Sequence, residues 1–438
     1  MKYKARTTQI LATLCTSIAF AAGPAAKLDR ETAAYRFESE PSQPLGKFGA
    51  PTRDPKLTLR ASGSVYLLTV SGPHSGSKLG VAISSDGGDS FAPPAVISRP
   101  EGKVSSHGEN SPSFSFGNGI EVYALWEEST AQGLGTNLLV ARSPAFGHSW
   151  LPPVKITDKT KPSTNAFSSM TVASNGDIYA VWLDGRDREM GPPGTSSVYL
   201  AKSTDRSKTF GGNVAVAHGV CPCCRPTAIA DARGTVHVSW RHVYPGNLRD
   251  MAVATSRDGG ETFGQPVRVA HDKWKINGCP HAGASMVQKG NRLWMSWYSD
   301  GDGSNAGVRL AYSDDAAQSF SKPVLVSRGI LDANHPSLAF ADDGRLLLAF
   351  QGRDPEKNDG WSPAGPYLIE ISDAGHASAP IQVPGHKSSI SYPTVAGGSL
   401  GRVFVAWTEK GKDGQQQIRL SRGRRVSRAP SSAPSNGE

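Results

Sequence analysis

One hydrophobic pattern recurs seven times along the chain: a short apolar strand, a turn, and a second strand in which apolar and polar residues alternate. This alternation has the two-residue period of a half-buried strand, and the turns contain Gly, Asn or Asp, so each copy predicts an antiparallel hairpin. A weak first copy ends at Val70. The other six end in aromatic residues spaced 53 to 58 positions apart: Trp126, Trp182, Trp240, Trp297, Phe350 and Trp407.

A third strand follows most hairpins and leads into a second motif. The motif occurs five times, as "SSDGGDSF" (84–91), "SPAFGHSW" (143–150), "STDRSKTF" (203–210), "SRDGGETF" (256–263) and "SDDAAQSF" (313–320). We expect its Asp and Ser side chains to hydrogen-bond to the backbone of a turn, with Gly supplying an open backbone angle. The motifs resemble the Asp boxes, Ser-x-Asp-x-Gly-x-Thr-Phe/Trp, of the sialidase-like propellers. Three copies depart from that pattern, with Ala145 in place of Asp and with Ser207 and Ala317 in place of Gly.

Four strands per unit and seven units predict an all-β fold, a β-propeller of seven four-stranded antiparallel blades. The alternative is six blades with an appended hairpin, because the sialidases that the motifs resemble usually have six. The last unit stops after its third strand, and the segment "AYRFES" (34–39) is expected to supply the missing outer strand. We divide the chain into a signal peptide (1–22), an N-terminal segment (23–50), the propeller (51–423) and a basic, Pro/Ser-rich tail (424–438) that we expect to be disordered.

The first 22 residues have the layout of a secretory signal peptide: a basic start, an apolar run over 10–20, and small residues around position 21. We therefore expect a periplasmic or secreted protein. No second apolar stretch reaches about 18 residues, so we predict no membrane span. The formal net charge of +9 lies partly in the tail and comes with no nucleic-acid-binding motif, so no nucleic-acid partner is expected.

The cysteines are concentrated in two short segments. Cys15 lies in the apolar leader, whereas Cys221, Cys223 and Cys224 lie in "VCPCCRPT" and Cys279 lies in "GCPHAG", two residues before His281. The resemblance implies that segments leading into the innermost strands lie on one face, around the central funnel. These two segments precede neighbouring hairpins, so we expect the four thiols to meet at the funnel.

Three interpretations of this cluster compete. A Cys224 to Cys279 disulfide could join two blades, as is common in exported proteins. Alternatively, Cys221, Cys223, Cys224, Cys279 and His281 could bind a metal, copper(I) first or zinc in a Cys3His arrangement, because soft ligands select these ions. A redox-active Cys-x-x-Cys from Cys221 to Cys224 is the third interpretation. We take binding of a soft metal ion as the leading function.

The resemblance also implies an alternative, an exo-sialidase type of glycoside hydrolase that would take a glycan ligand. Such enzymes hold a carboxylate with three arginines and use an Asp acid/base and a Tyr nucleophile that is activated by a Glu. "TRDP" (52–55) is a partial match to the family's first motif, with Thr for the aromatic and Asp for Ile. The corresponding candidates are Arg53, Arg225, Arg353 and Tyr392, with Glu127 or Glu409 assisting. A structural or partner-binding propeller is the third possible function.

Overall fold

The computed structural model describes residues 35–40, 42, 45, 51–130, 135–158, 163–301, 305–357 and 362–426. The predicted signal peptide lies outside these residues, as does the tail from 427 onward. Short 3-10 helices interrupt the strands at η2 (His74–Gly76), η3 (Arg188–Met190), η4 (Pro355–Lys357) and η5 (Ser399–Gly401). Within the described residues, no helix has the length and apolar character needed to span a bilayer.

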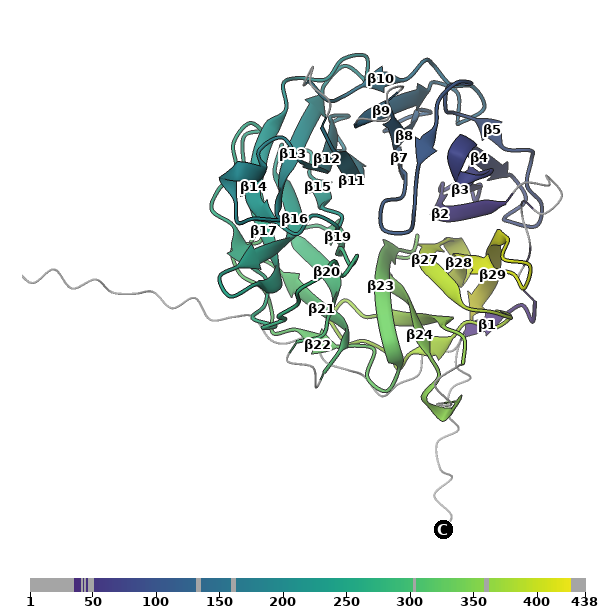
Figure 1. Ribbon diagram of the computed structural model, residues 1–438. Helices are drawn as coiled ribbons and strands as arrows, with labels where there is room; N and C mark the ends of the chain where they lie inside the picture. The colour runs from purple at the N-terminus through teal and green to yellow at the C-terminus, as the bar shows by residue number, and fades with distance from the viewer. Residues whose placement is uncertain are drawn as a thin grey trace, which may run out of the picture.

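The strands form antiparallel sheets arranged around a ring (Figure 1). The first sheet contains β2 (Thr52–Leu59), β3 (Val65–Ser71), β4 (Lys78–Ser84) and β5 (Ala95–Val96). The next contains β6 (Val104–Ser105), β7 (Ser113–Phe116), β8 (Val122–Ser129), β9 (Thr136–Ser143) and β10 (Val154–Lys155), with β6 and β7 both paired to β8.

A longer, curled sheet follows, with two groups of four strands. The first group is β11 (Asn165–Val172), β12 (Ile178–Asp184), β13 (Ser196–Ser203) and β14 (Val214–Val220). The second group is β15 (Thr227–Ala230), β16 (Val236–Tyr244), β17 (Leu248–Ser256) and β18 (Val267–Arg268). The groups are joined where β14 pairs with β16, through Val220 and His242.

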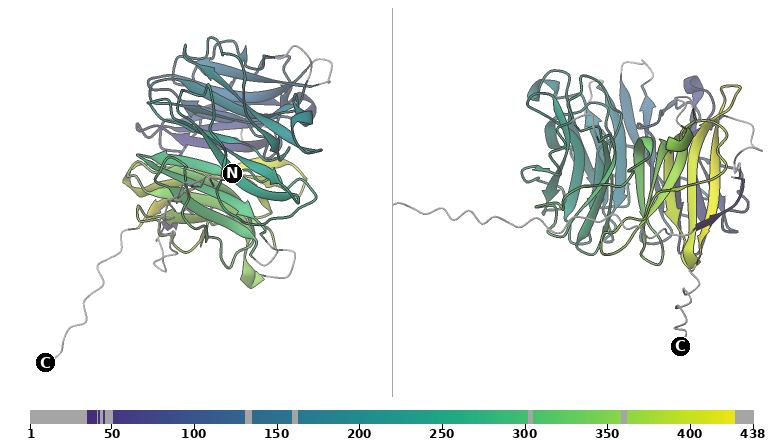
Figure 2. Two further views of the ribbon diagram at one scale, coloured as in Figure 1. Left: turned by 90° about the vertical axis from the view of Figure 1, so that its left-hand side faces the viewer. Right: turned by 90° about the horizontal axis from the view of Figure 1, so that it is seen from below.

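Three four-stranded sheets complete the ring. One contains β19 (Ser285–Lys289), β20 (Arg292–Ser299), β21 (Gly307–Ser313) and β22 (Val324–Leu325). Another contains β23 (Leu331–Phe340), β24 (Leu346–Arg353), β25 (Gly365–Ile371) and β26 (Ile381–Gln382). The last contains β27 (Ile390–Gly397), β28 (Arg402–Lys410), β29 (Gln416–Arg425) and β1 (Tyr35–Phe37). The fold is thus an all-β propeller in which five sheets, four with four strands and one with five, form a ring with one curled sheet, and the strands run across the thickness of the disc (Figure 2).

The hydrophobic core lies between neighbouring sheets, and the repeated aromatic residues are its largest members. Trp126, Trp182, Trp240, Trp297, Phe350 and Trp407 are all fully buried on the second strands of their hairpins. Trp126, for example, packs with Leu68 and Val70 of β3, across the gap between two sheets. Burial of this face explains the period-two pattern, since each strand must present its apolar side to the neighbouring sheet.

The N-terminal strand completes the last sheet from outside. β1 pairs antiparallel with β29, with Tyr35 opposite Arg425 and Phe37 opposite Gly423. The Tyr35 hydroxyl also donates to Glu370 Oε2 at 2.6 Å, which ties β1 to the preceding sheet. The ring is therefore held closed by strands from both ends of the described chain.

The Asp-box turns are formed by the predicted side-chain to backbone hydrogen bonds. Asp205 accepts from the Thr209 backbone N–H at 3.0 Å and from the Thr209 hydroxyl at 2.6 Å. Ser203 donates to Asp205 and accepts from the Ser207 N–H. Ser207 holds a left-handed φ of 59° without being glycine, so the hydrogen bonds support the turn where the motif departs from the family pattern.

These hydrogen bonds make the third Asp box sensitive to acid. The bonds from the Thr209 side chain and backbone lower the pKa of Asp205 from 3.8 to about 2. A carboxyl with a lowered pKa stabilises the fold above its ordinary pKa, and this contribution is lost as the pH falls from about 4 towards 2. We predict that Asp205→Asn lowers the thermal midpoint at pH 7 but no longer does so near pH 2. Asp342→Asn, in an exposed turn, is the control, and equal deficits at both pH values would contradict the prediction.

Candidate functional site

Left-handed backbone conformations recur at the entrance to the innermost strands. Asp54, Phe167, His335 and Tyr392 have φ between 50° and 56°, and each lies at a register shift between the first two strands of its sheet. His281 has φ 47° just before β19. Non-glycine residues rarely adopt this conformation, and bulges of this kind often redirect side chains at functional sites.

The side chains at these positions meet near the middle of the ring. The rings of His335 and Tyr392 are 4.0 Å apart, and those of Phe167 and His281 are 6.1 Å apart. Asp54 accepts a hydrogen bond from the Gly108 N–H at 3.0 Å. The segment 221–226, which contains the three clustered cysteines, has no residue with positive φ.

The loop that precedes β7 crosses the centre of the ring (Figure 1). A Cβ on Gly108 would lie 2.2 Å from the Tyr392 ring, so only glycine fits there. The next residue, Glu109, reaches the opposite side, where Oε1 accepts from the Gly283 N–H at 2.6 Å and from the Arg225 N–H at 3.3 Å. Glu109 thereby holds the two cysteine-bearing segments against each other.

Gly283 allows these two segments to approach closely. A Cβ at this position would lie 2.3 Å from Glu109 Oε1 and 2.6 Å from the carbonyl oxygen of Arg225. The backbone N–H of Ala282 also lies 3.5 Å from Cys224 Sγ. The absence of a side chain at Gly283 therefore helps to bring Cys279 and His281 next to the "CPCC" segment.

The four cysteines carry free thiols and form two overlapping groups with His281. Cys221, Cys223 and Cys224 are buried, and their sulfur atoms all lie within 4.8 Å of one another. Cys221 Sγ is 3.7 Å from Cys223 Sγ and 3.5 Å from Cys224 Sγ. The second group consists of Cys223, Cys279 and His281, also within 4.8 Å of one another. We call these the inner trio and the outer trio.

Two arginines place positive charge beside the inner trio. Arg249 Nη1 lies 3.1 Å from Cys221 Sγ. Arg241 is fully buried and donates only to backbone carbonyl oxygens, those of Ala282, Tyr298 and Arg249. Among the described residues, neither arginine forms an ion pair with a carboxylate. Buried charges are normally paired, so the thiols are the groups placed to supply the negative charge.

The thiol pKa values fit this arrangement. Hydrogen bonds from Cys223 and then from Cys224, together with the charges of Arg241 and Arg249, lower the pKa of Cys221. The pKa of Cys223 is raised, first by its hydrogen bond to Cys221, and that of Cys224 is raised, first by burial. Of the three thiols, Cys221 is the one whose pKa its surroundings lower.

The structure divides the five predicted metal ligands into two groups. All five predicted residues come together, but as two trios that share Cys223 rather than as one set, and no group of four forms among the described residues. The Cys224 to Cys279 disulfide is absent, since both thiols are free. His107 lies beside His281, with 6.5 Å between their rings, and belongs to neither trio.

The three arginines predicted for a sialidase-type site have separate hydrogen-bond partners. Arg53 donates to Gly72 O and Ser77 Oγ, and Arg353 Nε is 2.5 Å from Asp332 Oδ2. Arg225 Nη1 donates to Ser111 Oγ at 3.2 Å. Among the described residues, no two of these guanidinium groups share a hydrogen-bond partner.

Tyr392 has an acidic neighbour, but it is Glu109 rather than Glu127 or Glu409. Burial, and then the negative charge of Glu109, raise the pKa of Tyr392. Glu127 instead accepts from Asn110 Nδ2 at 2.5 Å, and burial raises its pKa to about 7. Glu409 pairs with Arg419 at 2.7 Å.

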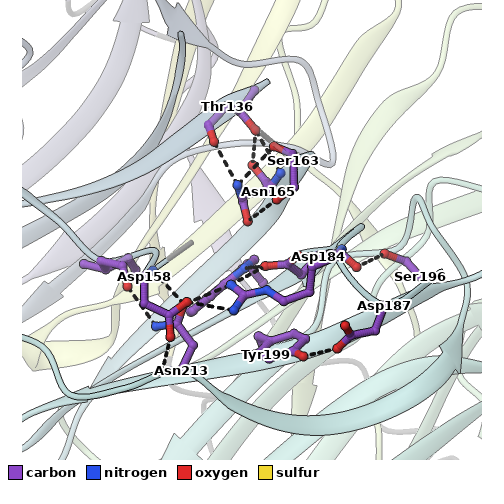
Figure 3. Close-up of polar contacts among 12 residues, drawn as sticks. Thr136, Asp158, Ser163, Asn165, Asp184, Asp187, Ser196, Tyr199 and Asn213 are labelled. Atoms are coloured by element: carbon purple, nitrogen blue, oxygen red, sulfur yellow. Dashed lines mark hydrogen bonds and ion pairs between the residues drawn. The ribbon is translucent and has the colours of Figure 1, made fainter. Parts of the chain in front are cut away.

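The charged residues of the Asp184–Asp187 loop are paired with one another and with Asp158 (Figure 3). Arg186 pairs with Asp184 at 2.8 Å and with Asp158 at 2.7 Å, and its guanidinium lies 4.1 Å from the centre of the Tyr199 ring. The Tyr199 hydroxyl donates to Asp187. These residues form a structural network in which each charge has a partner.

Several charged residues near the candidate site belong to no motif that could be recognised in the sequence. Lys56 lies on β2, and burial, followed by the charge of Arg225, lowers its pKa to about 7. Arg249 lies within an ordinary strand pattern. The contacts of Glu109 and Arg241 with the cysteine segments join residues far apart in sequence, and the repeat pattern does not specify such contacts.

Comparisons with known proteins define the fold. No family model matches the sequence, and a search of curated proteins finds no match. A Dyadobacter fermentans protein of unknown function is similar in structure, with 15% identity and a TM-score of 0.50, over 90% of this chain and 99% of that one. The GH93 α-L-arabinofuranosidase of Fusarium graminearum has 12% identity and a TM-score of 0.50, over 72% and 92% of the chains. The Hadza microbial sialidase Hz136 has 15% identity and a TM-score of 0.46, over 83% and 76%. At these identities the likeness concerns the fold alone, which is a β-propeller.

Proposed function

We propose that the protein binds a soft metal ion, copper(I) ahead of zinc, through its Cys/His cluster. The observation that carries the proposal is the inner trio of free, buried thiols whose sulfur atoms lie within 4.8 Å of one another. Thiolates are soft ligands that select copper(I) and zinc over hard ions such as magnesium or calcium.

Coordination number favours copper(I) over zinc. Structural zinc sites are almost always tetrahedral with four ligands, whereas each trio offers three ligand atoms. A Cys3His zinc site would need Cys221 or Cys224 to move towards His281. The inner trio already suits an ion that accepts three sulfur ligands.

The net charge of the metal complex also favours copper(I) over zinc. Three thiolates and one copper(I) ion carry two net negative charges, and Arg241 and Arg249 supply two positive charges beside them. Three thiolates and a zinc ion would carry only one negative charge. Because uncompensated charge is costly away from water, the buried Arg241 and the partly buried Arg249 favour the more negative complex.

Metal content measured together with free thiols tests the proposal. We expect protein purified anaerobically to take up copper(I) in a one-to-one ratio, and Cys223→Ser and Cys224→Ser to abolish tight binding, measured by mass spectrometry and thiol titration. Ser239→Ala, at a buried position on β16, should bind like the unmodified protein. A chain with no metal uptake and four reactive thiols would contradict the proposal.

The charge argument makes a separate prediction about Arg249. We expect Arg249→Met to weaken copper(I) binding by about 10- to 100-fold, as for other residues that support direct ligands, and Arg249→Lys to restore part of the loss. Competition with a chromophoric copper(I) chelator measures the change. Arg257→Met, exposed just after the same strand, is the matched control, and an equal loss in this variant would exclude a specific role for Arg249.

A glycoside hydrolase is the second candidate, and the position of Tyr392 beside Glu109 is the observation that favours it. The raised pKa of Tyr392 keeps its hydroxyl protonated at neutral pH, so the phenol could attack a sugar only while a base takes its proton. Glu109 is the carboxylate placed for this role, and Arg225 and Lys56 supply positive charge nearby.

Activity assays separate this candidate from metal binding. If the protein hydrolyses aryl sialosides or arabinofuranosides, we expect Tyr392→Phe to abolish turnover and Glu109→Gln to lower kcat by about 100-fold or more, the scale of general acid–base catalysis. Tyr123→Phe, in the core on β8, should keep full activity. Activity that survives Tyr392→Phe would remove this tyrosine as the nucleophile.

We also propose that the ring counts seven blades and that the protein is exported. The division of the curled sheet into two four-stranded groups, joined by one residue pair, supports the count. The signal-peptide pattern over 1–22 supports export to the periplasm or the medium. In such an oxidising compartment, a bound metal would protect the clustered thiols from disulfide formation.

A further inference from the structure

We propose that the two trios are successive copper(I) sites that share Cys223: the outer trio accepts the ion at the surface, and the inner trio holds it. This inference rests on the proposed metal-binding function and assigns different roles to its ligands. The ion would pass from Cys279 and His281 to Cys221 and Cys224 while Cys223 stays bound.

The burial of the ligands indicates that the ion moves from the outer trio to the inner trio. Cys279 is exposed and His281 is partly buried, whereas Cys223 is 3% exposed and Cys221 and Cys224 are 0% exposed. An incoming ion can therefore reach the outer trio without any rearrangement. It cannot reach Cys221 or Cys224 from solvent except past other groups, and Cys223 is the ligand that borders both sites.

Ligand exchange through a shared sulfur needs no change of oxidation state. Copper stays as copper(I) throughout. The bonds from copper to Cys279 Sγ and to the His281 ring nitrogen break, and bonds to Cys221 Sγ and Cys224 Sγ form. Cys224 gives up its thiol proton, and the released Cys279 thiolate takes up a proton, so charge and protons balance. Because Cys223 remains bound, the ion is never released into water.

Electrostatics favours the inner position at equilibrium. The outer trio binds copper(I) with two thiolates and a neutral imidazole, whereas the inner trio binds it with three thiolates. The additional negative charge is stabilised by Arg249, 3.1 Å from Cys221 Sγ, and by the buried Arg241. Because Arg249 lies against Cys221 Sγ, and Cys221 belongs to the inner trio alone, the complex gains stability as the ion moves inward.

Separate measurements of loading rate and affinity test this assignment on the full chain. Copper(I) is supplied as its bicinchoninate complex under anaerobic conditions, and stopped-flow absorbance follows its transfer. We expect Cys279→Ser and His281→Ala to slow loading several-fold while final affinity changes little. Cys221→Ser and Cys224→Ser should lower affinity by more than about 100-fold, because losing a direct ligand costs more than losing a supporting residue. His148→Ala, an exposed histidine in an Asp-box turn, is the control.

X-ray absorption on the same samples identifies the ligands directly. The unmodified protein with one equivalent of copper(I) should show sulfur ligands only, and Cys224→Ser should show a nitrogen ligand from His281. Equal losses of affinity in all four variants would overturn the two-site assignment in favour of one mixed site. Unchanged loading rates in Cys279→Ser and His281→Ala would remove the outer trio as the acceptor. Failure of the unmodified protein to bind copper(I) at all would instead reject the proposed function.

Discussion

The buried charge of Arg241 is the constraint on which the candidate site depends. Transferring a guanidinium group out of water costs several kcal/mol, and carbonyl oxygens satisfy its N–H groups without neutralising its charge. Arg241 donates to three backbone carbonyls and to no carboxylate among the described residues. The nearby sulfur atoms are the remaining place for negative charge, so the arginine and the thiols stabilise each other.

The same contacts hold two neighbouring sheets together. Arg241, on β16, donates to Ala282 O, just before β19, and to Tyr298 O, on β20, so both acceptors belong to the next sheet. Glu109 adds a second connection from across the ring, through the N–H groups of Arg225 and Gly283. The thiols therefore lie between two sheets that are connected both by Arg241 and by Glu109. These connections define the spacing of the thiols even without a metal.

The sequence predicts the fold and the meeting of the thiols because both follow from the repeat. Cys221 and Cys279 are placed alike relative to Trp240 and Trp297, so the period alone brings them to neighbouring sheets. The division into two trios depends on side-chain positions within a few ångströms, which periodicity does not encode. The partnership of Tyr392 with Glu109 depends on a loop that reaches into the centre of the ring. Each of the three predicted arginines is engaged by a different partner: Ser77 for Arg53, Ser111 for Arg225 and Asp332 for Arg353.

The left-handed residues at the inner strands have an evolutionary consequence. Each of Asp54, Phe167, His335 and Tyr392 occupies the same structural position in a different sheet, and its side chain takes no part in the strand's own ladder. A substitution at one of them can alter the chemistry at the axis while the sheets behind it stay intact. The centre of such a ring can accumulate new reactive groups one residue at a time, so members of one fold can diverge in function without an intermediate that fails to fold.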